Sequence, residues 1–148
     1  MPALNTDQIL NQLKMNLEGY TIANGYTYDA QTVSRKIIDV ANDLKNSQTP
    51  AFVLLPGKDE LIEENIDLDV RNFTVQVVGY FRERGGNDDI SADIEVLKRE
   101  TQDLIKQAYG NPGDPVLRVF TSEIDPSAVS GFAKDADFIL AVNYRYFN

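Results

Sequence analysis

Asp39, Asp43 and Lys45 follow the acid…acid-x-lysine pattern of metal-dependent nucleases. In that chemistry two carboxylates hold Mg²⁺ and a lysine steadies the attacking water. Two acids four residues apart do share one face of a helix, but nuclease acids normally sit on the strands of a sheet. An acidic protein also binds DNA poorly, because it repels the phosphates. A Mg²⁺-dependent hydrolase therefore stands only as a secondary alternative.

A second pattern with chemical potential is the order strand, glycine pair, helix start around Gly85 and Gly86. Phosphate-binding loops are built in this order, because the N–H groups of a helix N-terminus bind anions. The stretch contains neither G-x-G-x-x-G nor GK[ST]. Asp88 and Asp89 also fall in the first turn of the following helix, where they complement its dipole and repel phosphate. The pattern predicts a turn followed by a capped helix.

Residues 57–69 are strongly acidic and could bind a hard cation, since Ca²⁺ and Mg²⁺ prefer carboxylate oxygens. The stretch lacks the D-x-[DN]-x-[DN]-G spacing of a calcium loop and its central glycine. We predict a solvated loop between two strands. Its acids are Asp59, Glu60, Glu63, Glu64, Asp67 and Asp69.

The sequence contains no cysteine and no histidine. It therefore has no disulfide, no thiolate or imidazole metal ligand, and no Cys-His or Ser-His-Asp constellation. With 23 acids a carboxylate pair for glycoside hydrolysis is always available, yet nothing singles one out and there is no tryptophan for sugar stacking. We expect no catalytic residues, no cofactor and no metal, so the protein is predicted not to be an enzyme.

The 148 residues suit one domain, residues 1–148, that is large enough to bury a core. The net charge of −9 argues against affinity for bare nucleic acid or anionic membrane. The N-terminal residues lack the basic and apolar regions of a signal peptide, and no run approaches the ~20 apolar residues of a membrane span. We expect synthesis in a cytoplasm and no membrane partner.

Hydrophobic periodicity predicts an α/β (α+β) single domain of order α-β-(α)-β-β-α-β-β. The expected sheet is mixed but mostly antiparallel, with two or three helices packed on one face. In the long strand Phe73, Val75, Val77 and Phe81 should face the helix that ends at Tyr109. The predicted helices cover 6–18, 35–45 and 89–109, and the predicted strands cover 26–33, 50–57, 72–82, 116–124 and 137–147, the last two paired as a hairpin.

This order resembles the tail terminator or tail completion proteins of tailed bacteriophages, which include head-to-tail joining proteins. The resemblance runs from about residue 6 to the end and rests on element order rather than on a signature motif. Residues 34–49 are longer and more helical than the family leads us to expect. The resemblance rests on the segments NGYTYDAQTVSR, TPAFVLLPG, RNFTVQVVGYF, DISADIEVLKRETQDLIKQAYG and DFILAVNYRYF.

The resemblance implies a structural virion protein made in the host cytoplasm. Such proteins form a hexameric ring at the head-proximal end of the tail tube, where they stop tube polymerisation and present a surface for head-tail joining. The implied partners are further copies of the chain, the tail tube protein and a head completion or connector protein. DNA would pass through the lumen without specific binding.

The family offers no catalytic residues to carry over, so candidate contacts come from the residues themselves. We expect them in the acidic stretch and on the outer face and end of the long strand. The alternative function is a small non-catalytic adaptor or binding domain of a bacterium. The expected interface residues are Asp59, Glu60, Glu63, Glu64, Gln76, Tyr80, Arg82 and Arg84.

Overall fold

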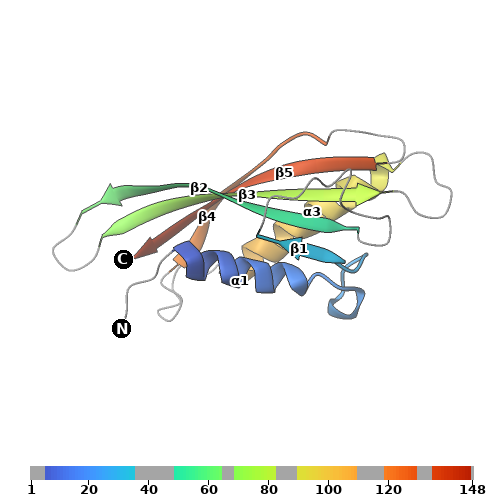
Figure 1. The fold of residues 1–148 in the computed structure, drawn as a ribbon, viewed down its shortest axis with the longest axis horizontal. Coiled ribbons are helices and arrows are strands. Elements are labelled where there is room, and N and C mark those ends of the chain that lie inside the picture. Colours follow the sequence, from blue (N-terminus) through green and yellow to red (C-terminus); the bar gives the residue numbers. More distant parts are fainter. Residues whose placement is uncertain are drawn as a thin grey trace.

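The computed structural model describes residues 6–35, 49–64, 69–82, 90–109, 119–129 and 135–147, which form two α-helices, a short 3-10 helix and one five-stranded sheet (Figure 1). The strand order is β1-β2-β3-β5-β4, with β1 parallel to β2 and the other pairs antiparallel. The predicted α+β class with a mixed sheet is confirmed. The elements are α1 (Thr6–Glu18), η1 (Ile22–Asn24), β1 (Thr32–Ser34), β2 (Ala51–Glu63), β3 (Val70–Arg82), α3 (Ser91–Tyr109), β4 (Val119–Pro126) and β5 (Asp135–Phe147).

The helix α1 matches its predicted bounds of 6–18 and is held by one apolar stripe. The stripe follows helical spacing and is buried, so tertiary packing rather than propensity fixes the helix. Asp7 in the first turn complements the helix dipole. After the helix, Gly25 takes a φ of +96°, which favours glycine, and closes η1 with a bond from its N–H to the Ile22 carbonyl. The stripe consists of Ile9, Leu10, Leu13 and Leu17.

The long helix α3 packs beside α1 and against the same face of the sheet (Figure 1). Its buried positions are spaced three and four residues apart, as in an amphipathic helix. Thr101 is a polar residue on that buried face, and its hydroxyl donates to the Leu97 carbonyl at 2.6 Å. The buried apolar positions of α3 are Ile94, Leu97, Leu104 and Ile105.

The core lies between the two helices and the inward-facing residues of β2, β3 and β5. The strands β3 and β5 pair in register along their whole length, from Val70 opposite Phe147 to Arg82 opposite Asp135. The predicted inward face of β3 is confirmed, because Phe73, Val75, Val77 and Phe81 are all buried in the cluster that contains both helices. Alternate residues of β3 and β5 therefore face the opposite side of the sheet.

The predicted loop over residues 57–69 is wrong for residues 57–63, which belong to β2. They pair with the start of β3 despite their charge, with register shifts between Pro56 and Asp59 and between Leu61 and Glu63. Each shift places an extra residue in β2, and such bulges let an irregular polar segment continue a ladder. A neighbouring strand of high β-propensity thus outweighed the weak propensity of acids for strands.

The predicted strand 26–33 is also wrong in extent, since β1 covers only Thr32–Ser34. Its aromatic residues pack from a loop instead, where Tyr26 stacks on Tyr20 and Tyr28 contacts Phe81. The predicted hairpin of β4 and β5 is confirmed. The predicted helix 35–45 lies largely outside the described residues, so the described order is α-β-β-β-α-β-β.

Candidate functional site

No helix among the described elements packs on the second face of the sheet, here called the helix-free face. Its centre is a strip of mostly apolar side chains in two adjacent rows across three strands. Leu55, Gln76 and Ala141 form one row, and Val53, Val78 and Ile139 form the next. Gln76 is exposed, Ile139 is 38% exposed, and Leu55, Val78 and Ala141 are half-buried. Val53 is only 4% exposed, so the central strip is defined by the five remaining residues: Leu55, Gln76, Val78, Ile139 and Ala141.

A polar cluster lies at one end of the central strip, towards the start of β3. The Thr74 hydroxyl donates to the Asn143 Oδ1 at 2.8 Å, and the Asn72 amide donates to the same atom at 3.3 Å. Directly opposite Asn72, Arg145 is exposed on β5. These side chains are partly satisfied by one another, which is typical of the rim of a protein interface.

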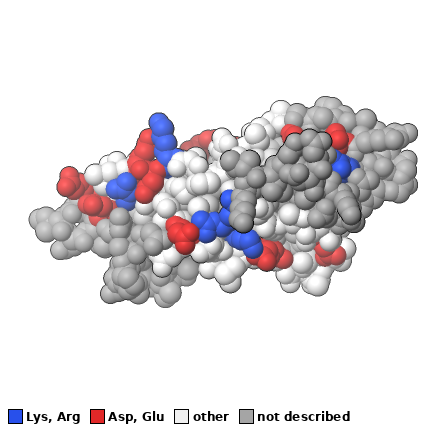
Figure 2. Space-filling view, viewed as in Figure 1, with Lys and Arg blue, Asp and Glu red and all other residues white. Residues whose placement is uncertain are grey.

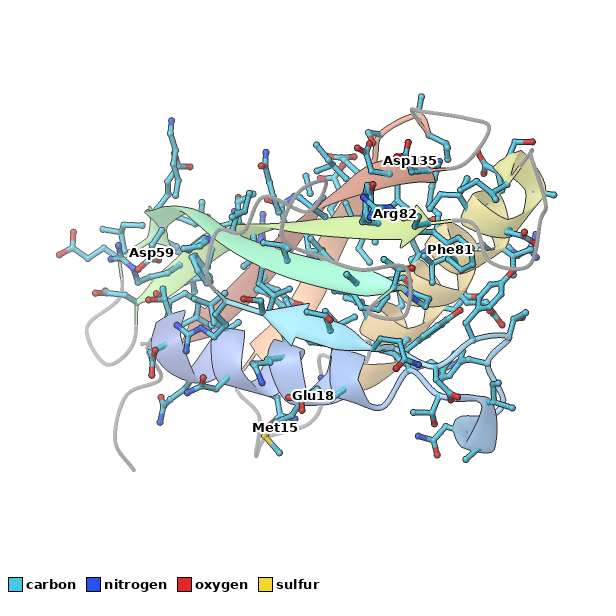
Figure 3. All side chains as sticks on the ribbon, turned by 45° about the vertical axis from the view of Figure 1, so that its right-hand side comes forward. Met15, Glu18, Asp59, Phe81, Arg82 and Asp135 are labelled. Atoms are coloured by element: carbon cyan, nitrogen blue, oxygen red, sulfur yellow. The ribbon has the colours of Figure 1, made fainter. Side chains whose placement is uncertain are left out.

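A second polar cluster lies at the other end of the strip and contains two of the predicted contact residues. Tyr80 is only 8% exposed. Its hydroxyl donates to Asp135 Oδ2 at 3.3 Å and accepts from Arg82 Nη2 at 3.0 Å, and the guanidinium stacks 5.5 Å from the ring centre. Figure 3 shows Arg82 and Asp135 close together on neighbouring strands. Tyr80 therefore positions Arg82 more than it offers surface of its own.

The outer ends of the paired strands β2 and β3 project beyond α1 as an arm, defined here as residues 59–64 and 69–71 (Figure 1). Asp59 ties this arm to β5. Its Oδ1 accepts from the Tyr146 hydroxyl at 2.7 Å and from Arg71 Nε at 3.0 Å. The three residues come from three adjacent strands, so one carboxylate links β2, β3 and β5.

The environment of Asp59 changes the titration of its tyrosine partner. Burial, and then the hydrogen bond to Asp59, raise the pKa of Tyr146 to about 12. The nearby Arg71 guanidinium opposes this rise, but by less than the other two causes. Tyr146 is 1% exposed, so its hydroxyl remains a proton donor to Asp59 well above neutral pH.

The other predicted contact residues of the arm are exposed acids. Glu60 lies 3.7 Å from Lys58 across a solvent-exposed ion pair, and Glu63 and Glu64 are exposed. Figure 2 shows acidic and basic side chains interleaved over this end of the molecule, so the visible surface is not a single-sign patch. Arg84 lies outside the described residues.

The predicted contact residues are therefore not brought together at one point. The acids of the arm lie at one end of β3, and Tyr80 and Arg82 lie at the other. At ~3.3 Å per residue these ends are roughly 40 Å apart. Gln76 lies between them on the helix-free face. Asp59 lies on the helix side of the sheet with Tyr146, so the predicted residues do not share one face.

A cavity of about 270 Å³ opens between the loop before β1, the end of β3 and the first turn of α3. Pro50, Phe81 and Ile90 supply a buried apolar floor, and Tyr28 supplies one wall. Asp29 and Asp93 lie among the lining residues. Figure 3 places Phe81 at the end of β3 beside α3.

Sequence reasoning missed both the cavity and the Asp59 link. Each depends on residues far apart in the chain, such as Tyr28 with Asp93 and Asp59 with Tyr146. Aromatic residues in the loop before β1 were the available signal, but they were assigned to a strand. The charge of the acidic stretch suggested a solvated loop, whereas its pairing with β3 places Asp59 beside Tyr146.

No helix in the described ranges is long and apolar enough to cross a membrane. Across the same ranges, no three carboxylates gather closely enough to hold a metal ion. A comparison of the sequence with known protein families and with curated proteins finds no match.

Proposed function

We propose that this protein is a structural component of a tailed-bacteriophage virion. In this role it is a tail terminator that assembles as a homo-oligomeric ring, a hexamer, on the head-proximal end of the tail tube. The ring stops tube polymerisation and presents a surface to the head completion or connector protein. The observation that carries the proposal is the helix-free face, with an apolar central strip flanked by two polar clusters.

An apolar centre with a polar rim is the arrangement of a protein–protein interface. The central strip supplies four aliphatic side chains, one glutamine and no Lys or Arg, and Ile139 is its most exposed large apolar residue. The flanking clusters supply oriented donors and acceptors at both ends, including Asn143 and Arg82. A ring needs a heterologous contact in which two different surfaces of the chain meet. The helix-free face provides one of these surfaces. The arm, at the opposite end of β3 from Tyr80 and Arg82, provides the second.

The charge of the chain supports passage of DNA through such a ring. With a net charge of −9 the protein repels phosphates, and a lumen lined by it lets DNA slide without being held. The α+β class with a five-stranded mixed sheet is compatible with the proposal, although the element order differs in part from the one on which the resemblance to tail terminators rests. Neither property distinguishes a ring from an acidic monomeric adaptor, so the oligomeric state is the decisive measurement.

The test measures mass in solution and inspects the protein by electron microscopy, alone and with tail tubes. We expect rings on tube ends and tubes of reduced, uniform length. A protein that stays monomeric beside tubes and leaves their length unchanged would refute the proposal. The adaptor alternative predicts that outcome.

A pair of matched variants assigns the contact to the helix-free face. Ile139→Glu places a charge in the central strip, and we expect it to abolish rings without unfolding the subunit. Met15→Glu is the control, because Met15 is 65% exposed on α1 and points away from the sheet (Figure 3). Rings that survive Ile139→Glu would move the interface elsewhere.

A further inference from the structure

The cavity beside Phe81 is not used by the ring proposal, and its lining combines features that recognise a ligand. Its floor is apolar and buried, with Phe81 6% exposed and Ile90 1% exposed. Asp29 and Asp93 add two carboxylates to the same lining. An apolar pocket with a few convergent polar groups is the usual form of a binding site.

The size of the cavity limits what it can hold. At about 270 Å³ it lies just below the ~300–1,000 Å³ range of pockets for drug-sized ligands and cofactors. A single amino-acid side chain fits this space better than a nucleotide or a cofactor does. Ile22, also in the lining, is 59% exposed and offers apolar surface to whatever carries that side chain.

The electrostatic environment selects a cation. The described lining residues include two carboxylates and no Lys or Arg. Burial, the hydrogen bond to Asp93 and the charges of Asp93 and Glu100 together raise the pKa of Tyr28, in that order. The negative charge around the Tyr28 ring therefore extends beyond the cavity lining to Glu100.

Both carboxylates are held in place by the protein. Asp29 Oδ1 accepts from the Ile22 N–H at 2.7 Å, and Asp93 Oδ1 accepts from the Tyr28 hydroxyl at 2.9 Å. Each bond helps to fix the orientation of its carboxylate, which has about four acceptor sites in all. Preorganised acceptors reduce the ordering cost of binding.

We propose that this cavity binds the side chain of an arginine presented by another polypeptide. The aliphatic stem would pack on Phe81 and Ile90, and the guanidinium would lie against Tyr28 and donate to Asp29 and Asp93. Guanidinium is planar, stacks on aromatic rings and donates in a fork that matches carboxylates, whereas the ammonium of lysine is a compact, strongly hydrated charge. This inference is independent of ring assembly.

The test is a titration of the isolated, isotope-labelled protein followed by NMR, with N-acetyl-arginine methylamide as the probe. We expect the signals of Tyr28, Ile22 and Ile90 to shift with a dissociation constant on the order of 1 mM, as suits one side chain. The citrulline analogue has the same shape without the charge, and it should bind at least tenfold more weakly. The lysine analogue should bind more weakly than arginine by about threefold.

Two substitutions remove charge while keeping the hydrogen bonds that hold the cavity. Asp29→Asn and Asp93→Asn each retain an acceptor oxygen, and each should weaken arginine binding about fivefold. Asp125→Asn on β4 is the matched control, since Asp125 is an exposed carboxylate outside the cavity lining. Equal binding of arginine and citrulline would overturn the proposal. Unchanged affinity in both Asn variants, or shifts confined to residues elsewhere, would overturn it as well.

Discussion

Replacing Gly79 by alanine tests the packing between the two central strands. Gly79 pairs with Phe138, and the ring of Phe138 occupies the space in which a Cβ would lie. An added Cβ would come closer than 3.0 Å to three atoms of that ring. Phe138 is fully buried in the core, so its ring has no solvent to move into.

Two opposing effects set the magnitude of this change. A glycine inside a strand is worse than alanine by about 0.5–1 kcal/mol, so the substitution gains that amount from the backbone. Overpacking of a filled core costs about 1–3 kcal/mol, and a clash with three ring atoms belongs at the upper end. The net expectation is a loss of about 2 kcal/mol, or a fall in Tm of about 4–8 °C for a domain of this size.

The assay is urea unfolding followed by circular dichroism, with Gln76→Ala as the control on the same strand. Gln76 is exposed, and its substitution should change the free energy of unfolding by less than about 0.5 kcal/mol. Adding Phe138→Leu should relieve the clash, so the double variant should lose about 1–2 kcal/mol less than the sum of the single losses. A Gly79→Ala protein as stable as wild type, or strictly additive losses, would refute the proposed packing.

Three further predictions concern the arm, the tyrosines and the loop after α1. Asp59→Ala should lower the free energy of unfolding by about 1–2 kcal/mol, because it leaves the Tyr146 hydroxyl without its acceptor. Adding Tyr146→Phe should lower it little further, and additive losses in urea unfolding would contradict the link. Because the folded pKa of Tyr146 is raised from 10.0 to about 12, the unfolded chain loses this proton first, so its contribution to stability is complete below pH 10 and is lost between pH 10 and 12. Absorbance at 295 nm measures the ionisation of tyrosine, and unfolding at pH 9–12 measures the loss of stability. A uniform tyrosine midpoint near 10 with constant stability would disprove the prediction. Gly25→Ala should lower stability by about 1 kcal/mol in thermal unfolding, because alanine is strained at a φ of +96°. Nothing lies within 4 Å of the added methyl, so the loss comes from the backbone alone, and an unchanged Tm would contradict this.

Local periodicity predicted the elements that bury one continuous stripe or face. The bounds of α1 agree with the stripe from Ile9 to Leu17, and the alternation from Phe73 to Phe81 predicted the inward face of β3. In these elements propensity and burial favour the same state, so sequence alone suffices. The same holds for the hairpin of β4 and β5.

Where local and long-range preferences conflict, the sequence was misleading. Residues 57–63 are polar enough for a loop, yet pairing with β3 makes them a strand. Tyr26 and Tyr28 have high strand propensity, yet they pack on Tyr20 and Phe81 from a loop. The cavity and the Asp59 link require such long-range neighbours, so no local pattern could have predicted them.

The pairing of β3 with β5 also orders events during synthesis. The central ladder joins residues such as Val77 and Leu140, so β3 gains its second neighbour only after β5 has been translated. Such a distant contact forms late and slowly compared with a local hairpin. The rows of the helix-free face span both strands, so this face forms only after β5 has been translated. Association through it therefore requires the long-range ladder to be in place first.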